Sequence, residues 1–125
     1  MSDPIFKHFG GFEVDPPSLE EAGIVVLPLC YERAPSYGEG SRKGPFHILA
    51  ASEQIESMDE ETLAHWSAFP IYTANPLFPS GNPEKAVMEM KKAAEPFLKA
   101  GKFLLSLGGD HAITIGPVKA AKEVY

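Results

Sequence analysis

The sequence contains a single cysteine, Cys30, so it has no internal disulfide, which is typical of proteins kept in a reducing compartment. Basic residues are also few. The 11 Lys and Arg stand against 17 Asp and Glu, and the net charge of −6 excludes a broad basic face for nucleic acid or anionic lipid. No apolar run approaches the roughly 20 residues that a membrane-spanning helix needs, and the N-terminus lacks the basic and apolar segments of a signal peptide. We therefore expect a cytoplasmic protein with no nucleic-acid or membrane partner.

The residues that are present indicate a folded α/β protein. Hydrophobic residues make up 44% of the chain, and the 11 Gly and 12 Pro indicate that much of it is loop. Two short apolar runs without alternation predict strands of a parallel sheet that are buried on both faces. Other segments carry the start and end signals of helices. The predicted elements are strands over 23–28 and 102–107, a short edge strand over 70–73, and helices over 45–55, 83–100 and from near Thr114 onward.

The end of the chain suggests an incomplete sheet. The sequence stops at Tyr125 inside a predicted helix, whereas a strand–helix unit normally returns to its sheet. Two clear strands and one short strand are also few for a parallel sheet that is buried on both faces. We expect residues 1–22 to form an N-terminal arm and residues 23–125 to be the N-terminal portion of a larger α/β domain.

The segment Gly108-Gly109-Asp110-His111 is the main candidate for chemistry. It follows a predicted strand, and ligand sites in parallel sheets lie at the carboxyl ends of strands. The glycines allow a sharp turn and a close backbone approach. Imidazole is a common ligand of divalent metals, and a neighbouring carboxylate can orient it. From these residues alone, a metal site, a strand-end turn with a hydrogen-bonded histidine, and an anion site at the following helix all stay open.

The long loop over residues 29–45 offers weaker candidates. The spacing of its glycines matches neither phosphate-binding pattern, so nucleotide binding is not expected. Arg33, Tyr37 and Arg42 are placed to meet a substrate, although solvated loop charges are the simpler interpretation. Cys30 is expected to be a small buried apolar group, because no partner base that would make it a nucleophile is evident.

Two ordered segments resemble the ureohydrolases, the family of arginase and agmatinase, with agmatinase most similar. The first comprises Pro28-Leu29-Cys30-Tyr31-Glu32-Arg33, Ser36-Tyr37-Gly38, Gly40 and Gly44-Pro45, and the second comprises Leu107-Gly108-Gly109-Asp110-His111-Ala112-Ile113-Thr114, Gly116 and Ala120. The resemblance implies a three-layer α/β/α fold with a mostly parallel central sheet. It also implies two Mn²⁺ ions holding a bridging hydroxide, a guanidino substrate with agmatine as the first choice, and trimers or hexamers of complete chains.

The resemblance assigns His111 as a terminal ligand of one Mn²⁺ and places Asp110 beside it as a neighbour of the metal ligands. The other family ligands come from later Asp-x-His-x-Asp and Asp-x-Asp segments that this sequence does not contain. Catalytic residues are therefore expected downstream of Tyr125, and residues 1–125 alone are expected to be inactive. Ala112 also stands where many members carry Ser. The alternative is a non-catalytic interaction or assembly module derived from the same fold, because an unpaired strand edge recruits other chains.

Overall fold

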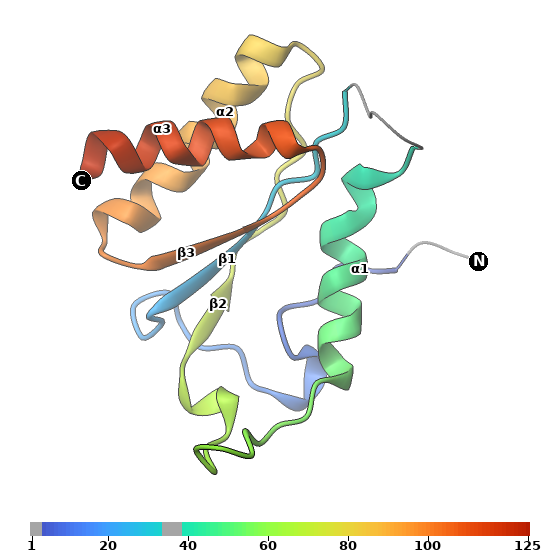
Figure 1. Ribbon diagram of the computed structural model, residues 1–125, viewed down its shortest axis with the longest axis vertical. Coiled ribbons are helices and arrows are strands. Elements are labelled where there is room, and N and C mark those ends of the chain that lie inside the picture. Colours follow the sequence, from blue (N-terminus) through green and yellow to red (C-terminus); the bar gives the residue numbers. More distant parts are fainter. Residues whose placement is uncertain (1–3, 34–38) are drawn as a thin grey trace.

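The computed structural model describes residues 4–33 and 39–125, and its centre is a parallel three-stranded sheet (Figure 1). The strands are β1 (Ile24–Pro28), β2 (Ile71–Thr73) and β3 (Phe103–Leu107), in the order β2-β1-β3. Ile24 pairs with Ile71 on one side and with Phe103 on the other. The predicted parallel strands are confirmed, with β2 as the expected edge strand.

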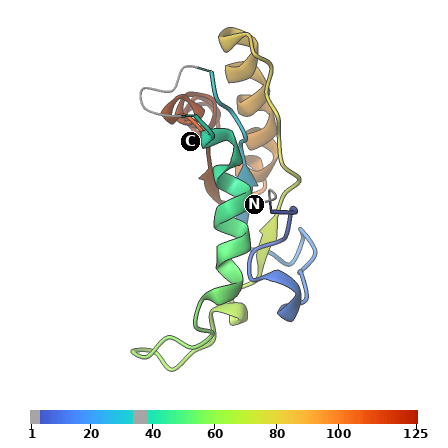
Figure 2. The same ribbon diagram turned by 90° about the vertical axis from the view of Figure 1, so that its right-hand side faces the viewer.

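Helices cover both faces of the sheet, as Figures 1 and 2 show together. The helices α2 (Pro83–Lys99) and α3 (Ile115–Val124) lie on one face, and α1 (Gly44–Ala51) lies on the other. This is the predicted α/β/α layering. The predicted helix over 45–55 consists of α1 followed by a short 3-10 turn, Ser52–Gln54. The Asn82 side chain caps α2 by accepting a hydrogen bond from the Lys85 amide at 3.1 Å.

The main core lies between the sheet and the α2–α3 layer. Val25 and Leu27 project from β1 toward this layer, where they join residues of α2 and Ala120 of α3. Gly116 lets the two helices approach closely, since an added Cβ would lie 2.8 Å from the Val87 carbonyl oxygen and from the Lys91 amide nitrogen. The core residues are Val25, Leu27, Leu29, Tyr31, Ala74, Ala86, Met90, Ala94, Leu98 and Ala120.

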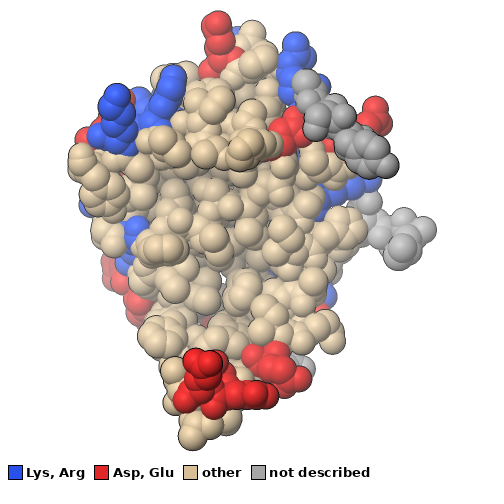
Figure 3. Space-filling model, viewed as in Figure 1, with Lys and Arg blue, Asp and Glu red and all other residues tan. Residues whose placement is uncertain are grey.

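The prediction that strand 102–107 is buried on both faces is wrong. Phe103 is 69% exposed and Leu105 is 45% exposed, while the paired β1 residue Val26 is buried. Because β3 is an edge strand and α1 packs over β1, the α1 side of β3 has no cover from the described residues. Figure 3, drawn from the same side as Figure 1, shows a broad area without charged side chains across the middle of the molecule. An apolar run in the sequence identified the strand but not the absence of a neighbour.

The N-terminal arm packs onto its own chain. The Phe9 amide donates to Thr73 Oγ1 at 2.9 Å, and the Gly10 amide donates to Ser52 Oγ at 2.9 Å. The Phe9 ring lies edge-on to Trp66, with 5.1 Å between centroids.

Among the described residues, no helix combines the length and apolar character needed to cross a membrane.

Candidate metal-binding turn

The turn after β3 lies at the carboxyl edge of the sheet, where the sequence placed it. Gly109 has a φ of +89°, and an added Cβ would lie 2.6 Å from the Tyr31 carbonyl oxygen and 2.8 Å from that of Leu29. The Asp110 amide donates to the same Tyr31 oxygen at 2.8 Å. The turn therefore packs directly against the segment that follows β1, and only glycine fits this conformation and this close approach.

Asp110 and His111 lie side by side at the beginning of a short 3-10 helix, His111–Thr114. This 3-10 helix precedes α3, so helical structure begins three residues before the predicted start near Thr114. The Asp110 carbonyl accepts a hydrogen bond from the Ile113 amide at 3.0 Å, and its carboxylate accepts one from the Arg33 amide at 2.7 Å. The His111 side chain is exposed. The turn thus presents an accessible imidazole next to a carboxylate that is engaged with the chain.

The described residues do not form a complete metal site. Nowhere among them do three or more His, Cys, Asp or Glu side chains gather closely enough to hold an ion. His111 suits the role of one ligand, because its imidazole is exposed at a strand end and can reach an ion. A divalent transition metal normally takes several oxygen and nitrogen ligands, so any metal bound here needs ligands beyond these residues. The assignment of His111 as a ligand, with Asp110 beside it, stays a prediction.

The loop after β1 is organised around Glu32. Its Oε2 pairs with the Arg42 guanidinium at 3.0 Å, and its Oε1 accepts a hydrogen bond from the Gly40 amide at 2.6 Å. The Glu32 side chain is only 7% exposed, whereas that of Arg42 is 56% exposed. Arg42 is therefore an ion-paired loop residue, Arg33 is exposed, and Tyr37 lies outside the described residues.

Hydrogen bonds keep Glu32 ionised at acidic pH. The Ser41 hydroxyl lowers the pKa of the Glu32 carboxyl, burial opposes this, and backbone amides of Gly40, Arg42 and Ser41 lower it further. A lowered pKa in the folded state means that the contribution of Glu32 to stability is present at neutral pH. That contribution is lost as the pH falls through the folded-state pKa.

The hydrogen bonds that Glu32 accepts are therefore expected to be lost only below the ordinary carboxyl pKa of 4.5. We expect the Gly40 amide chemical shift to titrate with a midpoint below 4.5, and the Glu32→Gln variant to lack this transition. NMR titration from pH 7 to pH 2.5 checks this. A midpoint at or above 4.5 would show that the hydrogen bonds to Glu32 are not formed in solution.

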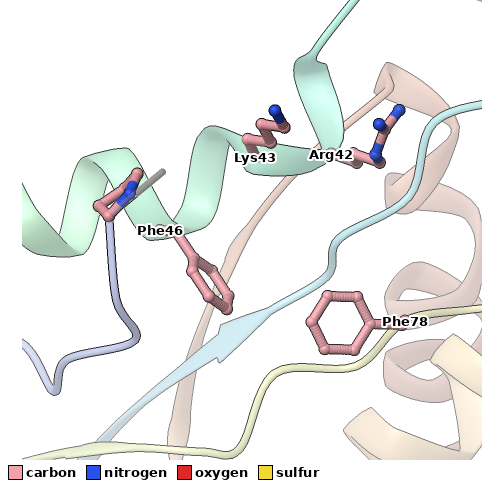
Figure 4. Close-up of a pocket in the computed structure, with 5 residues that line it drawn as sticks. Arg42, Lys43, Phe46 and Phe78 are labelled. Atoms are coloured by element: carbon pink, nitrogen blue, oxygen red, sulfur yellow. The ribbon is translucent and has the colours of Figure 1, made fainter. Parts of the chain in front are cut away.

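One pocket among the described residues lies away from the candidate metal-binding turn. It has a volume of about 250 Å³ and is lined by Pro4, Arg42, Lys43, Phe46 and Phe78. Figure 4 shows the Phe46 and Phe78 rings side by side; they pack edge-on, with 6.2 Å between their centroids. Neither Asp110 nor His111 lines it. Its two basic residues also suit a cationic guanidino group poorly, so we do not assign it to such a substrate.

Cys30 is buried, as expected, and is not placed for nucleophilic chemistry. Burial raises the pKa of its thiol to about 11, and the residue is only 5% exposed. The reactive thiolate is therefore about a thousandth of the population at pH 8. His47 and His65 are exposed, and His8 Nε2 lies 2.8 Å from the Val14 carbonyl oxygen.

Alkylation tests the burial of Cys30 directly. We expect iodoacetamide at pH 8 to leave the folded chain unmodified for hours and to label it completely within minutes in 8 M urea. Intact-mass spectrometry measures both. Rapid labelling of the folded chain would show that the segment after β1 opens readily, since a thiol must be exposed and ionised to react.

Residues 22–125 match the Arginase family, and the chain belongs to this family. A curated N(1)-aminopropylagmatine ureohydrolase from Synechocystis is 40% identical over 112 residues, which is 85% of this chain and 37% of the relative. An agmatinase from Bacillus subtilis is 26% identical over 110 residues, which is 87% of this chain and 38% of the relative. The chain therefore spans a little over a third of the length of these relatives.

Solved structures show the same partial overlap. The agmatine ureohydrolase of Thermoplasma volcanium superposes with a TM-score of 0.72 at 26% identity, covering 83% of this chain and 36% of that one. A Trypanosoma cruzi formiminoglutamase variant, solved with Mn²⁺, superposes with a TM-score of 0.73 at 20% identity, covering 85% and 37%. The sheet and helices described here thus correspond to one portion of the arginase fold, as the sequence predicted.

Proposed function

We propose that this chain is the N-terminal part of a manganese-dependent ureohydrolase, with residues 1–22 as an arm and residues 23–125 as part of the α/β domain. His111 supplies one metal ligand in this proposal, and Asp110 holds the turn beside it. The observation that carries it is an exposed imidazole at the carboxyl edge of a parallel sheet, in a chain of the Arginase family. Manganese, when bound, lowers the pKa of water and so provides hydroxide for attack on a poorly electrophilic guanidinium carbon.

The substrate in this proposal is a cationic guanidino compound that is hydrolysed to urea and an amine. Agmatine is the expectation from the sequence, and the relatives add a second choice. The 40% identical relative is named for N(1)-aminopropylagmatine, whereas four relatives named agmatinase are 25–29% identical. The identities therefore favour N(1)-aminopropylagmatine over agmatine. Homo-oligomerisation of the complete protein stays a prediction.

A chimera tests this proposal. Residues 22–125 would replace the matching segment of the Synechocystis relative, and urea release from both substrates would be measured with Mn²⁺. We expect urea release, faster from N(1)-aminopropylagmatine. The isolated 125-residue chain with Mn²⁺ is expected to release none, because its described residues gather no cluster of three ligands. A folded, metal-loaded chimera without activity would contradict the enzyme assignment, and activity of the isolated chain would contradict its inactivity.

One observation favours a second candidate, an assembly module. Phe103 and Leu105 expose an apolar strip on an edge strand, and such an edge is a template for another chain. Sizing chromatography with light scattering distinguishes the candidates in the isolated chain. A defined oligomer that persists at micromolar concentration would favour the module, and a monomer would count against it.

A further inference from the structure

The loop after β1 and the turn after β3 are joined by direct hydrogen bonds. Ser41 Oγ lies 2.8 Å from Asp110 Oδ1, and the Gly109 amide donates to the Ser41 carbonyl at 3.2 Å. The Arg33 amide donates to Asp110 Oδ2 at 2.7 Å. Contacts from two positions of the loop therefore converge on the single residue that precedes His111.

Ser41 is itself held in place by Glu32. Ser41 Oγ lies 2.9 Å from Glu32 Oε1, and the same carboxylate accepts hydrogen bonds from the Gly40 amide and the Arg42 guanidinium. Ser41 opens a short 3-10 turn, Ser41–Lys43, that leads directly into α1. The Ser41 hydroxyl is thus fixed between a carboxylate of its own loop and a carboxylate of the turn.

We infer that Ser41 is a positioning residue for His111 that acts through Asp110, and that Glu32 in turn positions Ser41. Asp110 is the residue from which the 3-10 helix His111–Thr114 begins, and its carbonyl accepts the Ile113 amide. Holding its side chain and backbone sets the direction in which His111 leaves the turn. Only the role of His111 as a metal ligand rests on the proposed function; the positioning of the turn does not.

Truncation of Ser41 is expected to break one link and spare the other. A hydroxyl has one proton, so it donates to only one of the two carboxylates at a time. In Ser41→Ala, Glu32 keeps the Arg42 guanidinium and the Gly40 amide, and its loop stays organised. Asp110 loses the side-chain contact that spans from the loop to the turn. Ser41→Thr keeps a hydroxyl and is the matched rescue variant.

The test uses residues 1–125 and compares Ser41→Ala, Ser41→Thr and the control Thr62→Ala. Thr62→Ala also removes a hydroxyl that donates to a carboxylate, that of Asp59, at 2.6 Å. Thr62 lies in the loop between α1 and β2, far from the start of α3 (Figure 1). Hydrogen exchange of the Asp110 amide, which is bonded to the Tyr31 carbonyl, reports on the turn. The residual dipolar coupling of the His111 N–H reports on its orientation.

In Ser41→Ala we expect Asp110 exchange to be about tenfold faster, as for the loss of one hydrogen bond, with a changed His111 coupling. Amides of α2 should be unchanged. Ser41→Thr should restore both readings, and Thr62→Ala should leave both as in the wild type. The inference is overturned if Ser41→Ala changes Asp110 exchange by less than twofold, or if Ser41→Thr behaves as Ser41→Ala does.

A separate measurement, the broadening of histidine ring signals by Mn²⁺, tests the proposed function. Mn²⁺ added to the wild-type chain should broaden the His111 ring signals before those of His47 and His65, and Ser41→Ala should need several times more Mn²⁺ for the same effect. Equal broadening of all three histidines would contradict the metal role of His111. The exchange rate of Asp110 and the His111 coupling would still decide whether Ser41 positions the turn.

Discussion

Replacement of Gly109 by alanine is expected to lower the free energy of unfolding by about 2–5 kcal/mol, which is a large share of the 5–15 kcal/mol typical of a domain. A φ of +89° costs an alanine about 1–2 kcal/mol, and the added Cβ collides with the carbonyl oxygens of Tyr31 and Leu29 at 2.6 and 2.8 Å. Backbone atoms of a buried segment cannot move aside as a flexible side chain can. The change should be measured by urea denaturation followed by circular dichroism.

Gly101→Ala is the matched control for this prediction. Gly101 also has a positive φ, +76°, but an added Cβ there meets no atom within 4 Å. Its replacement should therefore carry only the conformational cost, about 1 kcal/mol. If the two alanine variants lost the same stability, the turn after β3 would not be packed against the segment after β1, and the geometry of the candidate site would be wrong.

His111→Ala in the chimera is expected to have the second large effect. Loss of one metal ligand should reduce bound manganese from about two ions to about one per chain. It should also lower urea release by roughly 100-fold or more, because replacing even a group that only hydrogen-bonds to a ligand costs about 10- to 100-fold. Stability without metal should change little, because the His111 side chain is exposed. Metal content by elemental analysis and urea release by a colorimetric assay measure the two effects.

His47→Ala is the control for the metal measurement. His47 is also exposed, but it lies on α1 rather than in the turn after β3. We expect it to leave both manganese content and urea release as in the unsubstituted chimera. If His111→Ala also left both unchanged, the role that the sequence resemblance gives to His111 would be wrong.

Much of the fold follows from local sequence signals. The unalternated run at Ile24–Pro28 predicted a buried parallel strand, and Asn82 and Gly101 marked the ends of α2. These signals work because strand propensity and helix capping depend on residues within a few positions of one another. The placement of the Gly108–His111 segment at the carboxyl edge followed from the parallel topology.

Features that depend on distant partners could not be predicted. The exposed face of β3 depends on whether another element covers Phe103 and Leu105, which an apolar run does not reveal. The role of Glu32 is not evident from the sequence either, although Glu32 lies within the loop over residues 29–45. Its partners Gly40 and Arg42 are 8 and 10 residues away, and the hydrogen bond of the Ser41 hydroxyl to Asp110 joins positions 69 residues apart. No local spacing pattern signals such contacts.

The most direct test of the central claim is a crystal structure of the chimera grown with Mn²⁺, using anomalous scattering to locate the metal. We expect a manganese peak at bonding distance from a ring nitrogen of His111, with the Asp110 carboxylate still bonded to Ser41 and the Arg33 amide. Manganese peaks coordinated entirely by other residues, with the His111 ring turned toward solvent, would show that His111 is not a metal ligand.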